Sequence, residues 1–322
     1  GAPGSKIIMT TRPLSLLTQL GYNQPSSLSI LSRDNAVSLF CQHAFGENNF
    51  DSYPTLKPHG EGIVEKCDGL PLALIALGRL LRTKTDEDEW KELLNSEIWS
   101  LGKRDEITPA LRLSYNDLSA SLKQLFAYCS LFPKDYMFDK EELILLWMAE
   151  GFLHQSTTNK TMERLGHEGF DELLSKSFLQ HAPDDKSLFV MHDIMNDLAT
   201  SVAGDVFSRL DIEMKMEFRK EALEKQRQFS LVCEKYMVYK RFKPLEGAKN
   251  FRTFLALSVG VLEDWDTFYL SNKVLNDLLQ ELPLLRVLSL SHLRISEVPK
   301  VVGSMKHLRY LNLSRTQITH LP

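Results

Sequence analysis

The sequence predicts a multidomain protein that is mainly α-helical with α/β parts. Three observations predict this architecture. Helical periodicity fills much of the first third of the chain, further helical segments followed by a β-hairpin pattern fill the middle, and a leucine pattern repeats near the end. A length of 322 residues is enough for about two or three domains.

Composition narrows the class of protein. A hydrophobic content of 43% and a charged content of 25% are ordinary for a soluble globular chain. The net charge of −4 gives no general basic field that would attract nucleic acid. The four cysteines form no CxxC pair, which indicates a reducing compartment and argues against a zinc site or a disulfide framework. The longest apolar run, residues 70–77, is far shorter than the roughly 20 residues of a membrane-spanning helix.

Residues 1–30 open with a short apolar strand pattern, the IIM of "GSKIIMTTR", which runs into two threonines and Arg12. Strands that end in hydroxyl groups and a cation commonly present these groups to a phosphate in α/β nucleotide-binding sheets. Taken alone, however, Arg12 is more often a solvated arginine after a strand.

Residues 31–103 predict a small helical domain. In "SRDNAVSLFCQHAF" the apolar residues recur with the period of a helix. "GLPLALIALGRLL" is apolar on every side, which indicates a buried helix, and Pro71 falls in its first turn, where proline is tolerated. "TDEDEWKELLNSEIWSL" has acidic residues in its first turn, which suit the helix dipole.

Residues 104–204 predict a winged-helix arrangement, in which several helices precede a β-hairpin. Helices are expected at 106–115, 119–128, 139–151 and 159–178. The turn "APDDKS" between alternating apolar residues indicates the hairpin. A helix from about Ile194 to Ala203 closes the unit, with Asp193 as its expected N-cap. Four large apolar side chains of "CSLFPKDYMF" and "LLWMAEGFL" are expected in the core: Phe132, Phe138, Trp147 and Phe152.

Residues 205–322 combine a charged linker with the start of a leucine-rich repeat. "LRVLSLSHLRI" at 285–295 and "LRYLNLSRTQI" at 308–318 follow the template LxxLxLxxNxL at an offset of 23 residues. "FRTFLAL" at 251–257 resembles an earlier, degenerate copy. A solenoid needs about three repeats and a cap to be stable, so we expect the repeats to continue beyond Pro322 and the sequence to be a segment of a longer chain.

These motifs together resemble one family. "GSKIIMTTR", "AVSLFCQHAF", "GLPLAL", "CSLFPKDYMFDKEELILLWMAEGFL", "MHDIMNDLA" and the leucine-rich repeats occur in the order found in plant disease-resistance proteins of the coiled-coil, nucleotide-binding (NB-ARC), leucine-rich-repeat (NLR) family. The resemblance covers nearly the whole chain and implies four parts. These are the C-terminal remnant of a P-loop nucleotide-binding domain (1–30), a helical ARC1 domain (31–103), a winged-helix ARC2 domain (104–204), and a linker with the first leucine-rich repeats (205–322).

The resemblance also implies the residues of a nucleotide site. Arg12 would reach the terminal phosphate, and Pro71 would pack against the adenine. His192 would bond to the β-phosphate of ADP and hold a closed state, which Asp193 would help to stabilise. The P-loop itself is missing, because the single Gly-Lys pair, in "SLGKR" at 100–104, lacks the Ser or Thr and the first Gly of GxxxxGK[ST]. The strand with the magnesium-binding aspartates is missing too, so Mg²⁺ is expected only with an upstream segment.

The implied function is an ADP/ATP-dependent molecular switch of a cytoplasmic plant immune receptor, in which bound ADP holds the closed state. The implied partners are ADP or ATP and a pathogen effector or host guardee protein that binds the leucine-rich repeats, with a homo-oligomer forming on activation. No catalytic residue and no metal ligand are assigned, and any ATPase activity would be slow and confined to the full-length protein. Neither a nucleic acid partner nor an integral membrane segment is expected.

Two other functions stay open. A winged helix could bind DNA, but the helix expected before the hairpin, 159–178, carries a net charge of −1, and a groove-reading helix should be basic. The chain could also be a leucine-rich-repeat scaffold without a nucleotide. At the level of single residues, Pro71 alone would be a helix-start proline and Asp193 alone a helix cap.

Overall fold

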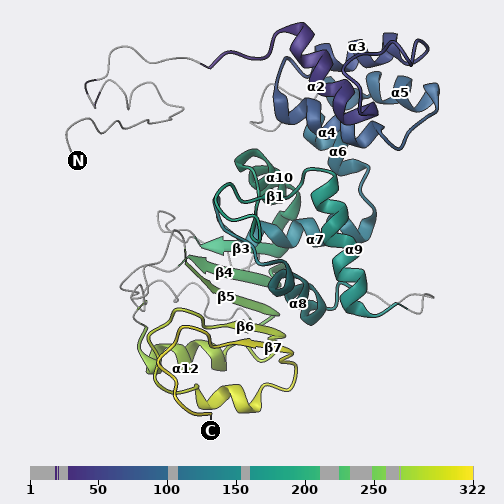
Figure 1. The fold of residues 1–322 in the computed structure, drawn as a ribbon. Helices are drawn as coiled ribbons and strands as arrows, with labels where there is room; N and C mark the ends of the chain where they lie inside the picture. The colour runs from purple at the N-terminus through teal and green to yellow at the C-terminus, as the bar shows by residue number, and fades with distance from the viewer. Residues whose placement is uncertain are drawn as a thin grey trace.

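The computed structural model describes residues 19, 21, 28–100, 108–153, 160–210, 225–232, 249–258, 268 and 270–321. Figure 1 shows these residues as three consecutive units: a helical unit (28–100), a winged-helix unit (108–203) and a parallel-sheet unit (from 207 to the end). Arg12 lies outside the described residues, so its phosphate-binding role stays a prediction.

The helical unit packs its helices round one apolar core. Its elements are α2 (Arg33–Phe45), α3 (Lys57–Lys66), α4 (Pro71–Leu81), α5 (Glu87–Leu94) and the short 3-10 helix η1 (Glu97–Ser100). Trp90 of α5 and Phe40 of α2 are fully buried in the core. Helix α4 lies close against α2 because Gly78 has no side chain: a Cβ there would lie 2.8 Å from the carbonyl oxygen of Phe40. Most residues of α4 are buried, which explains why its sequence is apolar all round.

The winged-helix unit has the predicted order of helices followed by a hairpin. Its elements are α6 (Pro109–Asn116), α7 (Ala120–Tyr128), η2 (Cys129–Leu131), α8 (Lys140–Glu150), α9 (Met162–Ser175), β1 (Gln180–His181), β2 (Phe189–Val190) and α10 (Asp193–Ala203). β1 and β2 are antiparallel, and Phe138 forms a bridge to Phe189. The prediction of four core side chains is confirmed, since none is more than 6% exposed: Phe132, Phe138, Trp147 and Phe152.

The parallel-sheet unit holds five strands in chain order. They are β3 (Phe207–Leu210), β4 (Gln228–Val232), β5 (Thr253–Leu257), β6 (Val287–Ser289) and β7 (Tyr310–Asn312). Val287 pairs with Tyr310 and Leu288 with Leu311, so the two predicted leucine copies lie side by side. The sheet begins two strands earlier than the leucine pattern indicated. An arrangement of stacked repeats fits this sheet, and the identification of a leucine-rich-repeat solenoid stays a prediction.

The parallel sheet is covered on both faces. Leu255, Leu257 and Val287 belong to the same apolar cluster as the core of the winged-helix unit. Phe254 and Leu288 point the other way, into a cluster with α12 (Asn272–Gln280), whose Leu275 and Leu279 are fully buried. The winged-helix unit therefore occupies one face of these strands (Figure 1).

Arginines of the sheet hold the C-terminal end of α8. Nη1 of Arg286 donates to the carbonyl oxygen of Glu150 over 2.6 Å, and Nη1 of Arg309 donates to that of Ala149 over 3.4 Å. Each arginine directly precedes a strand, and the backbone N–H of Arg309 donates to the carbonyl of Arg286. The last carbonyls of a helix lack partners within it and form the negative end of its dipole, so cations stabilise them.

The side chain of Glu150 is buried at the same junction, with 2% of its surface exposed. The hydroxyl of Thr253 and the amide of Gln228, which donates over 3.3 Å, both bond to its carboxylate. Burial raises the pKa of Glu150, and these hydrogen bonds offset that effect only in part. The contact between the winged helix and the sheet thus includes the buried carboxyl group of Glu150, and burial disfavours the charged form of this group.

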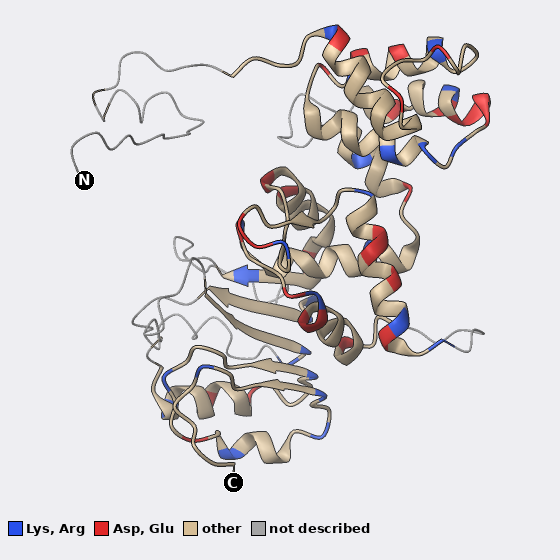
Figure 2. Cartoon of the chain, viewed as in Figure 1, with Lys and Arg blue, Asp and Glu red and all other residues tan. Residues whose placement is uncertain are grey.

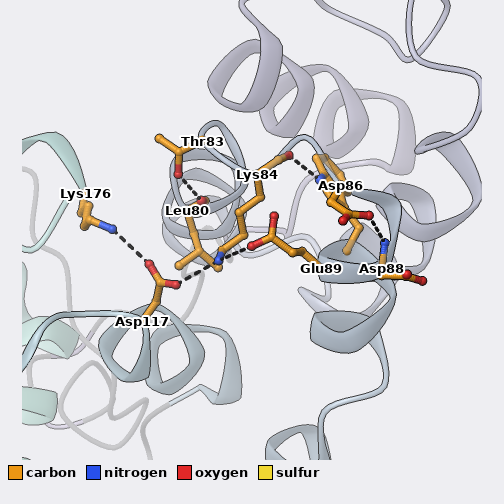
Figure 3. Close-up of polar contacts among 9 residues, drawn as sticks. Leu80, Thr83, Lys84, Asp86, Asp88, Glu89, Asp117 and Lys176 are labelled. Atoms are coloured by element: carbon orange, nitrogen blue, oxygen red, sulfur yellow. Dashed lines mark hydrogen bonds and ion pairs between the residues drawn. The ribbon is translucent and has the colours of Figure 1, made fainter.

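Ion pairs join the helical unit to the winged-helix unit around Asp117, which follows α6 (Figure 3). Nζ of Lys84, just after α4, lies 3.2 Å from one oxygen of Asp117, and Nζ of Lys176, at the end of α9, lies 3.1 Å from the other. Lys84 also pairs with Glu89 over 3.1 Å. Burial raises the pKa of Asp117, but the hydrogen bonds and charges of Lys176 and Lys84 outweigh burial, so the pKa lies below its ordinary value.

Replacing Glu150 by alanine should lower the free energy of unfolding by about 1–3 kcal/mol, because Thr253 and Gln228 would keep buried donors without an acceptor. Glu150→Gln should cost less, since an amide oxygen still accepts hydrogen bonds and a neutral side chain avoids burying a charge. Urea unfolding followed by tryptophan fluorescence measures both, because Trp147 lies in α8. Glu141→Ala, exposed on the same helix, is the control. Equal losses for Glu150→Ala and Glu141→Ala would contradict the burial of this contact.

Asp117 should contribute a pH-dependent part of the stability. Because its pKa is lowered in the folded state, the contribution is present above about pH 4, the ordinary pKa of aspartate, and is lost as the pH falls through the folded value. The difference in the free energy of unfolding between the wild-type chain and Asp117→Asn should therefore be largest near neutral pH and shrink in acid. Asp184→Asn, in the exposed hairpin turn, is the control. A difference for Asp117→Asn that does not change with pH would rule out the ion pairs as its cause.

Candidate functional site

The "GLPL" block forms a tight turn that starts α4. Leu70 has an extended backbone at the N-cap, and Pro71 takes the first helical position, where its fixed φ fits and its missing N–H costs nothing. The ring of Pro71 is exposed. Gly69 has a φ of 64° and allows the backbone of Leu31 to pass closely. The N–H of Leu31 donates to the carbonyl oxygen of Gly69 over 3.1 Å. A Cβ at Gly69 would lie only 2.7 Å from the carbonyl oxygen of Leu31. The backbone of Leu31 therefore passes beside this turn.

The "MHD" block forms the turn that starts α10. Its N-cap is His192, whose Nδ1 accepts a hydrogen bond from the backbone N–H of Ile194 over 3.3 Å. A ring nitrogen that accepts carries no proton, so Nε2 carries the proton of the neutral ring. The side chain of His192 is exposed, and this Nε2–H is available to donate to an anion.

The N-cap prediction for Asp193 was wrong by one residue. His192 has the extended backbone of a cap, with φ −59° and ψ 144°, whereas Asp193 is the first residue of the helix. The imidazole takes the acceptor role that Asn, Asp, Ser or Thr usually has. Asp193 is half-buried in the first turn, where a carboxylate suits the positive end of the helix dipole.

A cavity of about 630 Å³ opens between the helical unit and the winged-helix unit. One wall is a face of α4 with His43 of α2, and the other is the segment from the end of α9 into β1. The apolar lining residues are Leu72, Ile75, Leu174 and Leu179. The basic lining residues are His43, Arg79, Arg82, Lys176 and His181. No aspartate or glutamate is among the described residues that line the cavity.

Arg79 ties the two walls of the cavity together. Its Nη1 donates to the carbonyl oxygens of Leu174 and Ser175, over 3.3 and 3.2 Å, in the last turn of α9. Burial and the neighbouring charge of Arg82 lower the pKa of Arg79. Burial and, after it, the charges of Arg79 and Arg82 also lower the pKa of His43. Burial is the larger cause of both lowered pKa values, and the arginine charges add to it.

Neither Pro71 nor His192 lines this cavity, although Leu72, the residue after Pro71, does. The structure therefore places the two predicted residues at the starts of helices in neighbouring units, outside the cavity between those units. The sequence analysis did not single out Arg79 and Arg82. The available signal was a pair of arginines within and just after an otherwise apolar helix.

The described residues give little support for a reactive cysteine or a metal site. Burial raises the pKa of the Cys41 and Cys67 thiols to about 12, so neither is a ready nucleophile. Within the ranges that the structure covers, no three His, Cys, Asp or Glu side chains gather where they could hold a metal ion. None of the helices described there has the length and apolar character to cross a membrane.

Comparison with known proteins identifies relatives of the whole chain. The family described as "Disease resistance protein Winged helix domain" matches residues 131–199. A disease-resistance RPP13-like protein 1 of Arabidopsis thaliana is 38% identical over 323 residues, covering 100% of this chain and 30% of the relative. Disease resistance protein RFL1 of the same plant is 30% identical over 100% of this chain and 36% of its own length.

Another relative, disease resistance protein RGA2 of Solanum bulbocastanum, is 44% identical over 205 residues, which are 63% of this chain and 21% of the relative. The chain thus spans about a fifth to about a third of the length of these proteins. The match of the winged-helix family falls on the unit that the structure folds as helices and a hairpin. On these similarities along its whole length, the chain belongs to the family of plant disease-resistance proteins.

Proposed function

We propose that this chain is the nucleotide-controlled switch segment of a plant immune receptor. The observation that carries the proposal is the position of Pro71 and His192: each starts a helix, each is exposed, and the two helices belong to adjacent units. Helix N-termini attract phosphate groups. An ADP molecule held by both turns and by an upstream P-loop would fix the two units in one relative arrangement.

Each residue has a distinct role in this proposal. The exposed ring of Pro71 packs against the adenine, and Nε2–H of His192 donates to the β-phosphate. Asp193 keeps the turn of His192 in place from the first turn of α10. Arg12 reaches the terminal phosphate, and Mg²⁺ joins only with the upstream segment. The hydrogen bond between Leu31 and Gly69 supports this arrangement, because it holds the backbone of Leu31 beside the turn of Pro71.

The nucleotide alone does not account for a switch. Turning a mostly closed population into a mostly open one takes about 5.5 kcal/mol of differential binding. A hydrogen bond from His192 to a phosphate contributes about 1.5–3 kcal/mol. The remainder would come from contacts between the units, and the hold of the sheet on α8 through Arg286, Arg309 and Glu150 is one such contact. A pathogen effector or host protein bound to further repeats would act on this contact, in the cytoplasm.

DNA binding by the winged helix is not favoured by any observation. The cations at the start of α9 stand in ion pairs: Lys160, just before the helix, pairs with Glu168 over 2.7 Å, and Arg164 pairs with the same carboxylate over 3.2 Å. Cations that neutralise their own helix release no counterions from DNA.

The proposal predicts a specific loss of ADP affinity. In a protein extended upstream to include the P-loop, His192→Ala should weaken ADP binding by a factor of about 10–150, which corresponds to the loss of about 1.5–3 kcal/mol. Isothermal titration with ADP measures the change, and His307→Ala, exposed in the last part of the chain, is the control. Unchanged affinity in His192→Ala would refute the role of this residue, and no ADP binding in the extended wild-type protein would refute the switch.

A second consequence concerns signalling. In the full-length protein, Asp193→Val should loosen the closed state, because an apolar side chain replaces the carboxylate in the first turn of α10. The expected result is cell death in leaf tissue without a pathogen, measured at equal protein level. Asp184→Val, in the hairpin turn of the same unit, is the control and should stay silent. A silent Asp193→Val would count against the proposed role.

A further inference from the structure

We propose that the cavity between α4 and the α9–β1 segment is a second binding site, for a small phosphate ester with an apolar body. The site is separate from the turns of Pro71 and His192, neither of which lines the cavity. Its volume of about 630 Å³ lies within the range of small-molecule sites.

The charges around the cavity favour an anion. Lys176 forms an ion pair with Asp117, and one nitrogen of Arg79 donates hydrogen bonds to the carbonyl oxygens at the end of α9. Within the described part of the chain, the guanidinium of Arg82 forms no hydrogen bond or ion pair. Figure 2 shows blue Lys and Arg segments where the helical unit faces the winged-helix unit, and both red and blue segments on the outer side of the helical unit.

The excess of positive charge at the cavity indicates how much negative charge a ligand should carry. Helices α4 and α9 both end at the cavity, and each C-terminus carries about half a negative charge. Together these two ends offset about one of the two arginine charges. A surplus near one positive charge suits a single phosphate group better than a highly charged polyphosphate.

The apolar lining residues of the cavity favour a ligand that has an apolar body. Leu72 and Ile75 lie on one face of α4, on the N-terminal side of Arg79 and Arg82. Leu179 faces them from the other wall. A compound with an aromatic ring or short aliphatic body on one side and a phosphate on the other matches this division. Because it would touch both walls, its binding would hold the helical and winged-helix units together.

The test uses 1-naphthyl phosphate as the probe, with 1-naphthol and inorganic phosphate as its two halves. Isothermal titration of the 322-residue chain should show binding of 1-naphthyl phosphate at least tenfold tighter than that of either half. Arg82→Met should weaken binding about tenfold. Arg164→Met, the same exchange in the first turn of α9, should leave it unchanged.

Three outcomes would overturn the site: no binding by the wild-type chain, binding no tighter than that of inorganic phosphate, or equal losses in Arg82→Met and Arg164→Met. Circular dichroism of each variant establishes that it is folded. The result also differs from that for the proposed switch. Phosphate-ester binding here depends on Arg82 and needs no upstream segment, whereas ADP binding depends on His192 and the P-loop.

Discussion

Helix α4 is buried on two sides and thereby links the core of the helical unit to the core of the winged-helix unit. Leu74 and Leu77 of this helix pack in the core of the helical unit, while Ala76 belongs to the core of the winged-helix unit. The helix therefore cannot tilt or slide without disturbing both cores. Pro71 at its start and Arg79 near its end take their positions from this packing, so α4 fixes both candidate binding regions at once.

The polar contacts between the units follow one physical rule. Cations from one unit meet the carbonyls that close a helix of the next unit: Arg79 on α9, and Arg286 with Arg309 on α8. These carbonyls have no partners within their own helix and carry the negative end of its dipole. Such contacts lose much of their strength once water enters, because charges attract weakly at high dielectric constant. Entry of water at either interface should therefore weaken the polar contacts of that interface.

Much of the fold could be predicted from residue patterns. The leucine copies fixed the register of β6 and β7, and the alternation round "APDDKS" located the hairpin. The patterns gave no sign of β3, which is half-buried at the edge of the sheet, or of β4, which is buried on both faces, because neither strand follows the leucine template. The helix expected at 159–178 spans only Met162–Ser175, because Thr161 caps its start and Ser177 takes a left-handed backbone after its end. Local patterns do not record such tertiary and backbone effects.

The candidate site was less predictable than the fold. The "GLPL" and "MHD" blocks located Pro71 and His192, but the cap on α10 is made by the imidazole, which propensities rank below Asp193. Arg79 and Arg82 line a cavity only because α9 lies against α4, and no sequence pattern shows that contact. A structure of the upstream-extended protein with ADP bound would show whether the starts of α4 and α10 hold the nucleotide. We expect Pro71 against the adenine and Nε2 of His192 within about 3 Å of the β-phosphate. A nucleotide that contacts neither residue would contradict the proposed switch.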